Sequence, residues 1–212
     1  MKKQYFTIGL EEQLNMNWIL SDASGILQRM VELLPDRIQS HSRRVSTAAV
    51  TMAMHVPDHE MPYDLCRSGY CFALTYGTIC HELGIFLVRN RVKMRPAATE
   101  KLLVDFLPMG LSDNEKLVAV EAARSCYERY DSRGFPDKLA GEDIPLHSSI
   151  CAIADTMDMM LGDFPSDRQM YSAMEYIRRN KGKLFRPDAV RCFELAKDKL
   201  FSIYNVGSVV LS

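Results

Sequence analysis

Apolar side chains recur along this chain at spacings of three and four residues, the period of an amphipathic α-helix. The pattern runs from about residue 11 to about residue 204, and strand-like alternation is almost absent. It predicts an all-α fold, a helical bundle with one Gly/Pro-rich loop. The expected helices span residues 27–34, 38–52, 63–84, 112–130, 145–161, 166–180 and 187–204.

Local signals support several of these boundaries. Ser112 and Glu115 have the spacing of a capping box, Gly84 suits a helix C-terminus, and Pro187 suits a first helical turn. Residues 131–145 concentrate Gly and Pro, which predicts an ordered loop between two helices.

Composition and charge narrow the class of protein. Hydrophobic residues make up 47% of the 212 residues and charged residues 25%, which predicts one packed globular domain. The net charge of -1 gives no chain-wide attraction to DNA or to an anionic membrane, so any such binding must be local. No apolar run approaches the ~20 residues of a membrane span, and no signal peptide is evident. We therefore expect a cytoplasmic protein.

Cysteines lack the spacing of a zinc ribbon or a CxxC pair, which predicts free, mostly buried thiols in a reducing compartment. The six are Cys66, Cys71, Cys80, Cys126, Cys151 and Cys192.

Polar residues on apolar helix faces are the candidates for chemistry. These are His41, His81, Glu82 and Asp155. A single histidine in such a position is more often a hydrogen-bonded core residue, but a buried carboxylate such as Asp155 needs a proton or a cation. Two imidazoles and two carboxylates together form a donor set that suits Zn²⁺, Mn²⁺ or Fe²⁺. Such ions polarise phosphoryl groups, which predicts phosphoester chemistry.

Basic residues lie beside these positions in the sequence, either as a phosphate site or as ordinary solvated cations. They are Arg43, Arg44, Lys93, Arg95, Arg129, Arg133 and Lys138.

Longer motifs resemble the HD-GYP branch of the HD-domain phosphohydrolase superfamily. The matching stretches are Tyr127-Glu128-Arg129-Tyr130-Asp131-Ser132-Arg133-Gly134-Phe135-Pro136, Ile144-Pro145-Leu146, Ala152-Ile153-Ala154-Asp155, His41-Ser42-Arg43-Arg44-Val45 and Cys80-His81-Glu82-Leu83-Gly84. The resemblance implies a domain over residues 36–204, an N-terminal helical extension over 1–35 and a tail over 205–212. Active members of the branch use two or three metal ions to hydrolyse cyclic di-GMP.

Several positions depart from the family pattern. Glu82 replaces an aspartate, Ile85 a phosphate-contacting lysine and Phe106 a metal-binding histidine. Cys126-Tyr127 replaces a pair of histidines, and the sequence at 163–165 lacks the arginine of an Asp-Arg-Pro motif. What remains resembles the four-residue set with which the wider superfamily holds a single metal ion.

Two functions follow from this resemblance. The first is a degenerate HD-GYP protein of cyclic di-GMP-type signalling, with little or no catalysis, that acts by binding a nucleotide or a protein. The second is a mononuclear metal-dependent phosphohydrolase or phosphodiesterase. In both cases the expected cofactor is one divalent metal ion (Fe, Mn or Zn), held by His41, His81, Glu82 and Asp155. The alternative is that no metal is bound. Cys126 is a further candidate ligand, or a redox-active thiol.

Partner binding is expected at the loop that carries the Gly-Phe-Pro motif. In the family this loop is implicated in contacts with GGDEF domains; its alternative role is purely structural, with Phe135 as a core plug. A homodimer is a further expectation. The residues concerned, for a partner or for phosphate, are Glu128, Arg129, Asp131, Arg133, Gly134, Phe135 and Pro136.

Overall fold

The computed structural model describes residues 25–163 and 165–205. Over these residues it confirms the all-α prediction, with helices and short 3-10 turns and no strand. The α-helices are α3 (Gly25–Glu32), α4 (Asp36–Ala53), α5 (Arg67–Cys80), α6 (Arg95–Phe106), α7 (Asp113–Arg124), α8 (Leu146–Leu161), α9 (Asp167–Arg179) and α10 (Pro187–Asn205). The 3-10 turns are η1 (Asp58–Glu60), η2 (Pro62–Asp64), η3 (Leu83–Phe86), η4 (Val92–Met94) and η5 (Gly141–Asp143).

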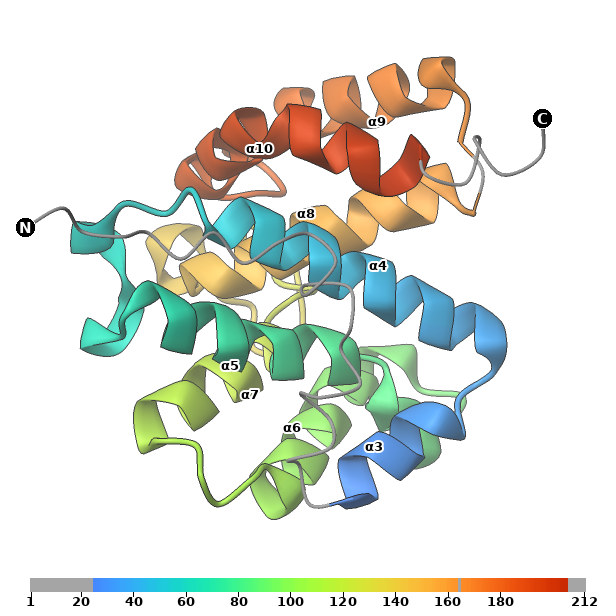
Figure 1. Ribbon diagram of the computed structural model, residues 1–212, viewed down its shortest axis with the longest axis vertical. Coiled ribbons are helices and arrows are strands. Elements are labelled where there is room, and N and C mark those ends of the chain that lie inside the picture. Colours follow the sequence, from blue (N-terminus) through green and yellow to red (C-terminus); the bar gives the residue numbers. More distant parts are fainter. Residues whose placement is uncertain (1–24, 164, 206–212) are drawn as a thin grey trace, which may run out of the picture.

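Helix α4 lies at the centre of the bundle (Figure 1), where it packs against α5, α8 and α10. On one side of it, α9 packs against α8 and α10. On the other side, α5 packs closely against α7. Gly77 of α5 allows this approach, because a Cβ there would collide with the carbonyl oxygen of Ala119 in α7.

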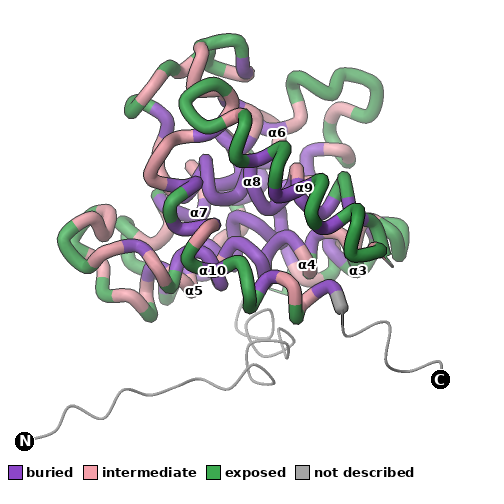
Figure 2. Tube along the Cα trace, turned by 90° about the horizontal axis from the view of Figure 1, so that it is seen from above, coloured by how far each residue is buried: buried purple, intermediate pink, exposed green. Residues whose placement is uncertain are grey.

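Two hydrophobic clusters hold these layers together. The larger joins α4, α8, α9 and α10 with parts of α5 and α7, and the smaller joins α3, α5, α6 and α7. Figure 2 shows the buried residues concentrated in the central helices, with exposed residues on the outer helices and loops. The part of the chain that the structure describes has no helix long and apolar enough to cross a membrane.

Three predicted helix boundaries were wrong. The helix expected over 63–84 ends at Cys80, because Gly84 belongs to the 3-10 turn η3 and does not terminate the helix. The same helix begins only at Arg67, because Tyr63 and Asp64 adopt positive φ angles of 56° and 55°. The helix expected to reach residue 130 ends at Arg124, although its predicted capping box is present. The sequence pattern also missed α6.

The cysteine prediction was correct for four of the six thiols. Cys80, Cys126, Cys151 and Cys192 are buried, but Cys71 is only partly buried and Cys66 is exposed. Cys66 is exposed because it is the N-cap residue of α5 and so precedes the packed part of the helix.

The predicted N-terminal extension is described only in part. Its residues 25–35 include α3, which buries Leu27 and Val31 in the smaller hydrophobic cluster. Residues 1–24, and residues 206–212 of the predicted tail, lie outside the described residues.

Candidate metal centre

Three helices bring the four predicted metal ligands together. His41 lies in α4, His81 is the C-cap residue of α5 and is followed by Glu82, and Asp155 lies in α8. We refer to these four residues as the quartet.

Donor atoms of the quartet face one another at short distances. The Nε2 atoms of His41 and His81 are 3.3 Å apart. Asp155 Oδ1 lies 3.1 Å from the first and 3.7 Å from the second, and Glu82 Oε1 lies 3.9 Å from His81 Nε2. Only His41 and Glu82, each 17% exposed in the side chain, open the site to solvent.

The hydrogen bonds behind the two imidazoles determine which nitrogen is protonated. His41 Nδ1 donates to Asp158 Oδ2 at 2.7 Å, and His81 Nδ1 donates to the Thr78 carbonyl oxygen at 2.5 Å. With the proton on Nδ1, each neutral ring presents an Nε2 lone pair to the other. Asp155 Oδ1 is buried and accepts no hydrogen bond from the described residues. These three acceptor atoms need a cation between them, so the residues present fit a divalent metal ion.

In the metal-free protein a proton takes this place. Burial opposes a charge on His41, but the carboxylates of Asp155 and Asp158 outweigh it and raise its pKa to about 9. Burial likewise opposes a charge on His81, but Asp155 raises its pKa to about 10. Burial disfavours the charged form of Asp155, yet the two histidines hold its pKa well below the usual range. Proton and metal therefore compete for the same atoms.

Asp158 and Arg44 hold His41 in position through hydrogen bonds from its second ring nitrogen and from Arg44 to Asp158, a role that was not predicted. Asp158 Oδ2 accepts the His41 hydrogen bond, while Arg44 donates to both oxygens of Asp158 at 2.6 and 3.1 Å. Tyr204 of α10 donates to Asp158 Oδ1 at 3.0 Å. The sequence signal was available, because Asp158 follows Asp155 by three residues and so shares its helix face.

Positions that depart from the family pattern are engaged in other contacts. Phe106 and Ile85 pack against the smaller hydrophobic cluster. The Cys126 thiol is buried and donates to the Ala123 carbonyl oxygen at 3.3 Å, and the neighbouring Cys151 thiol, together with burial, raises its pKa. Tyr127 donates its hydroxyl to Glu82 Oε1 at 3.0 Å. The proposed ligand role of Cys126 stays a prediction.

The Gly-Phe-Pro loop folds back on itself. Phe135 stacks on Tyr127 with ring centroids 5.2 Å apart, and its peptide bond to Pro136 is cis. Gly134 lies against the backbone of Glu128, where a Cβ would collide. We call residues 131–136 the motif loop.

Charged side chains at the loop are also paired. Arg129 donates to both oxygens of Asp131, at 2.9 and 2.6 Å, and the backbone N–H of Arg133 donates to Asp131 as well. Glu128 Oε1 accepts the backbone N–H groups of Asp137 and Lys138. These bonds give the predicted partner-binding residues a structural role, and a partner at the loop stays a prediction.

Residues 88–189 match the family model described as "HD domain". The match covers just under half of the chain. This match confirms the superfamily that the motifs resemble, and the loss of multi-metal catalysis stays a prediction.

Three curated relatives match this chain. A "3'3'-cGAMP-specific phosphodiesterase 2" of Vibrio cholerae is 36% identical over 87% of this chain. A "Cyclic di-GMP phosphodiesterase" of Thermotoga maritima is 24% identical over 59%. The "Cyclic di-GMP phosphodiesterase response regulator RpfG" of Xanthomonas campestris is 42% identical over 30%. The chain covers only 37%, 37% and 18% of these relatives, respectively.

Proposed function

We propose that this chain binds one divalent metal ion at the quartet and uses it to bind a cyclic dinucleotide in signalling, without rapid hydrolysis. The observation that carries the proposal is the convergence of two Nε2 lone pairs and one buried carboxylate oxygen. The relatives, whose names describe cyclic-dinucleotide phosphodiesterases, support the class of ligand.

The residues around the quartet support binding over rapid turnover. A divalent ion held by the quartet would polarise a phosphoryl oxygen. The positions where the resemblance implies further metal ligands carry Phe106, Cys126 and Tyr127. Phe106 packs against the smaller hydrophobic cluster, the Cys126 thiol donates to a carbonyl oxygen, and the Tyr127 hydroxyl donates to Glu82. Removing even one group that stabilises the transition state typically costs ~10²-fold or more in rate.

A mononuclear phosphohydrolase is the second candidate. The opening at His41 and Glu82 favours it, because a phosphoester could reach the quartet from solvent there. Phosphoester hydrolysis by one metal ion needs no ligand beyond the quartet. The two candidates therefore differ in turnover and share the metal site.

One experiment tests the metal site and separates the two candidates. Tag-free protein, purified without chelators, is analysed for metal by elemental mass spectrometry and then incubated with cyclic di-GMP. We expect about one metal ion per chain, metal-dependent binding and no linear product. Asp155→Ala should lose both metal and binding, whereas Asp113→Ala, which changes an exposed aspartate, should retain them.

The other outcomes are equally informative. Wild-type protein without metal would contradict the proposal. Product formation that disappears in Asp155→Ala would favour the phosphohydrolase.

A further inference from the structure

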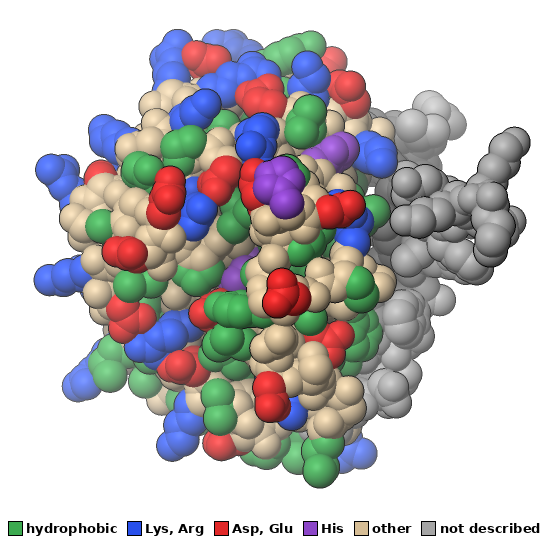
Figure 3. Space-filling view, turned by 90° about the vertical axis from the view of Figure 1, so that its left-hand side faces the viewer, with side chains coloured by type: hydrophobic (Ala, Val, Ile, Leu, Met, Phe, Trp, Pro, Cys, Tyr) green, Lys and Arg blue, Asp and Glu red, His purple; other side chains and the backbone are tan. Residues whose placement is uncertain are grey.

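The segment that follows His81 and Glu82 is strongly basic. From Leu83 to Thr99 the chain has four cationic residues and no acidic residue. They are Arg89, Arg91, Lys93 and Arg95. On the face of the molecule shown in Figure 3, by contrast, acidic and basic side chains are intermixed. A single-sign segment beside a candidate metal centre attracts anions to it.

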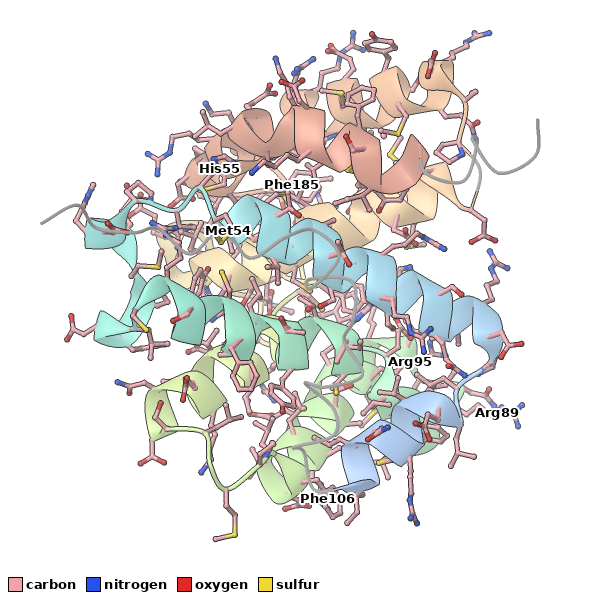
Figure 4. The ribbon with its side chains drawn as sticks, viewed as in Figure 1. Met54, His55, Arg89, Arg95, Phe106 and Phe185 are labelled. Carbon is pink, nitrogen blue, oxygen red and sulfur yellow. The ribbon has the colours of Figure 1, made fainter. Side chains whose placement is uncertain are left out.

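Arg95, the first residue of α6, connects this segment to the quartet. Its Nη1 lies 3.7 Å from Glu82 Oε2, which is too long for a hydrogen bond, and its side chain is 21% exposed. Its Nη2 donates to the Arg89 carbonyl oxygen at 2.9 Å. In the view of Figure 4, Arg89 lies at the edge of the molecule, whereas Arg95 lies farther from that edge.

The guanidinium of Arg95 keeps unused donor capacity. Its Nε is buried and makes no hydrogen bond with the described residues. Arg44 and Arg129, two other arginines in neighbouring motifs, each donate two hydrogen bonds to one aspartate. Among the described residues, Arg95 pairs with a carboxylate only through the long 3.7 Å contact with Glu82, so its partly exposed guanidinium can still donate to a ligand.

The backbone holds this arginine in place. Gly84, two residues after Glu82, lies so close to the Arg95 carbonyl oxygen that a Cβ would collide with it. Thr99 donates to the His81 carbonyl oxygen and accepts the Gly84 N–H, which ties α6 to the end of α5. The first turn of α6 has no acidic residue and no side-chain cap, so the helix dipole adds to the positive charge.

We propose that Arg95 is the phosphate-binding residue of this site, and that it holds a phosphoryl oxygen of a ligand whose other phosphoryl oxygen faces the quartet. This inference rests on the proposed function, and it specifies the ligand as a phosphate monoester or diester. Arginine suits the role because its planar donors match a phosphate group. The position where the family resemblance implies a phosphate-contacting lysine is Ile85, so Arg95 supplies a cation from a different element.

Phosphate titration tests the inference. Inorganic phosphate is titrated into wild-type protein, Arg95→Ala, Arg95→Lys and Arg91→Ala, and the metal content of every sample is measured. Arg91 is the matched control because it is exposed, belongs to the same segment and has a side chain that donates to the Met94 sulfur and to no carboxylate among the described residues. We expect Arg95→Ala to bind phosphate at least about tenfold more weakly at unchanged metal content, because a charge-assisted contact is lost. Arg95→Lys should stay within about fivefold of wild type, and Arg91→Ala should match it.

Each other outcome decides the matter. Equal phosphate affinity in wild type and Arg95→Ala would overturn the inference. It would also be overturned if Arg91→Ala lost as much phosphate affinity as Arg95→Ala, because the effect would then come from the overall positive charge of the segment. If Arg95→Ala also loses metal, both proteins are reloaded with metal before the titration: binding at least about tenfold weaker in metal-loaded Arg95→Ala than in metal-loaded wild type supports the inference, and equal binding overturns it. If wild-type protein holds no metal, the proposed function fails, while the dependence of phosphate binding on Arg95 still supports or overturns the phosphate role.

Discussion

The quartet and the motif loop use their polar side chains in opposite ways. In the quartet, the Nε2 atoms of His41 and His81 and Asp155 Oδ1 face each other and share one place for a proton or a metal ion. At the motif loop, Asp131 is bound by Arg129, which precedes the loop. Buried acceptor atoms that face each other need a cation, whereas paired groups stabilise the local backbone. The comparison assigns ligand binding to the quartet and a structural role to much of the loop.

The pH dependence of metal binding is the largest effect expected from this comparison. Because burial and the neighbouring carboxylates leave the pKa of His41 at about 9 and that of His81 at about 10, the two facing nitrogens hold a proton at neutral pH. A metal ion must displace the protons on these nitrogens, so its affinity should rise at least about tenfold per pH unit between about pH 6.5 and about pH 8.5. Competition with a chromophoric chelator measures this rise. A flat profile would show that no proton is displaced.

The stability of the metal-free protein should fall over the pH range in which the metal affinity rises. Both histidine pKa values lie above the ordinary value of 6.5, so their contribution to stability is complete below about pH 6.5. It is lost as pH rises through about 9 to 10. Thermal unfolding of metal-free protein should therefore have a lower midpoint at high pH, and Asp155→Asn should weaken this dependence.

The second effect concerns Asp158, which accepts the hydrogen bond from His41 Nδ1. Asp158→Asn removes the charge that holds His41 Nδ1–H and Arg44, so the metal affinity should fall about 10- to 100-fold. Asp163→Asn is the matched control, because Asp163 binds the same arginine and lies 58% exposed. Chelator competition measures both variants. Equal affinities in the two variants would show that the Asp158 hydrogen bond does not orient the ligand.

A smaller effect is expected in the motif loop. Phe135→Ala removes the ring that stacks on Tyr127, and this should lower the free energy of unfolding by about 1–3 kcal/mol. Metal affinity should change by less than about threefold. Denaturant unfolding measures the stability, with Phe86→Ala as the control, because Phe86 is 44% exposed. If Phe135→Ala is as stable as wild type, the structural role is wrong and the partner-contact role is favoured.

The smallest effect is expected at Cys126. Its thiol donates to the Ala123 carbonyl oxygen, so Cys126→Ala should change the metal affinity by less than about twofold. Cys192→Ala, another buried cysteine, controls for the loss of core packing. Metal loss confined to Cys126→Ala would identify the thiol as a ligand after all.

Much of the fold could be predicted from helical periodicity and capping residues. Both predicted signals at the start of α7, Ser112 and Glu115, form the expected capping box. Helix α6 was missed because its pattern is not amphipathic: Val104 is 67% exposed, whereas Thr99 is buried. Its position follows from contacts with η3 and α7, which lie outside any local sequence window.

The sequence by itself determined the all-α class and named the four residues of the quartet, because periodicity and residue chemistry are local properties. Only the tertiary structure decided that these residues meet, and that Asp158 and Arg44, separated by 114 positions, support them. It also decided which arginine keeps free donors, since Arg44 and Arg95 look alike in the sequence. The physical reason is that hydrogen-bond satisfaction depends on partners from distant helices, which residue type and spacing alone do not specify.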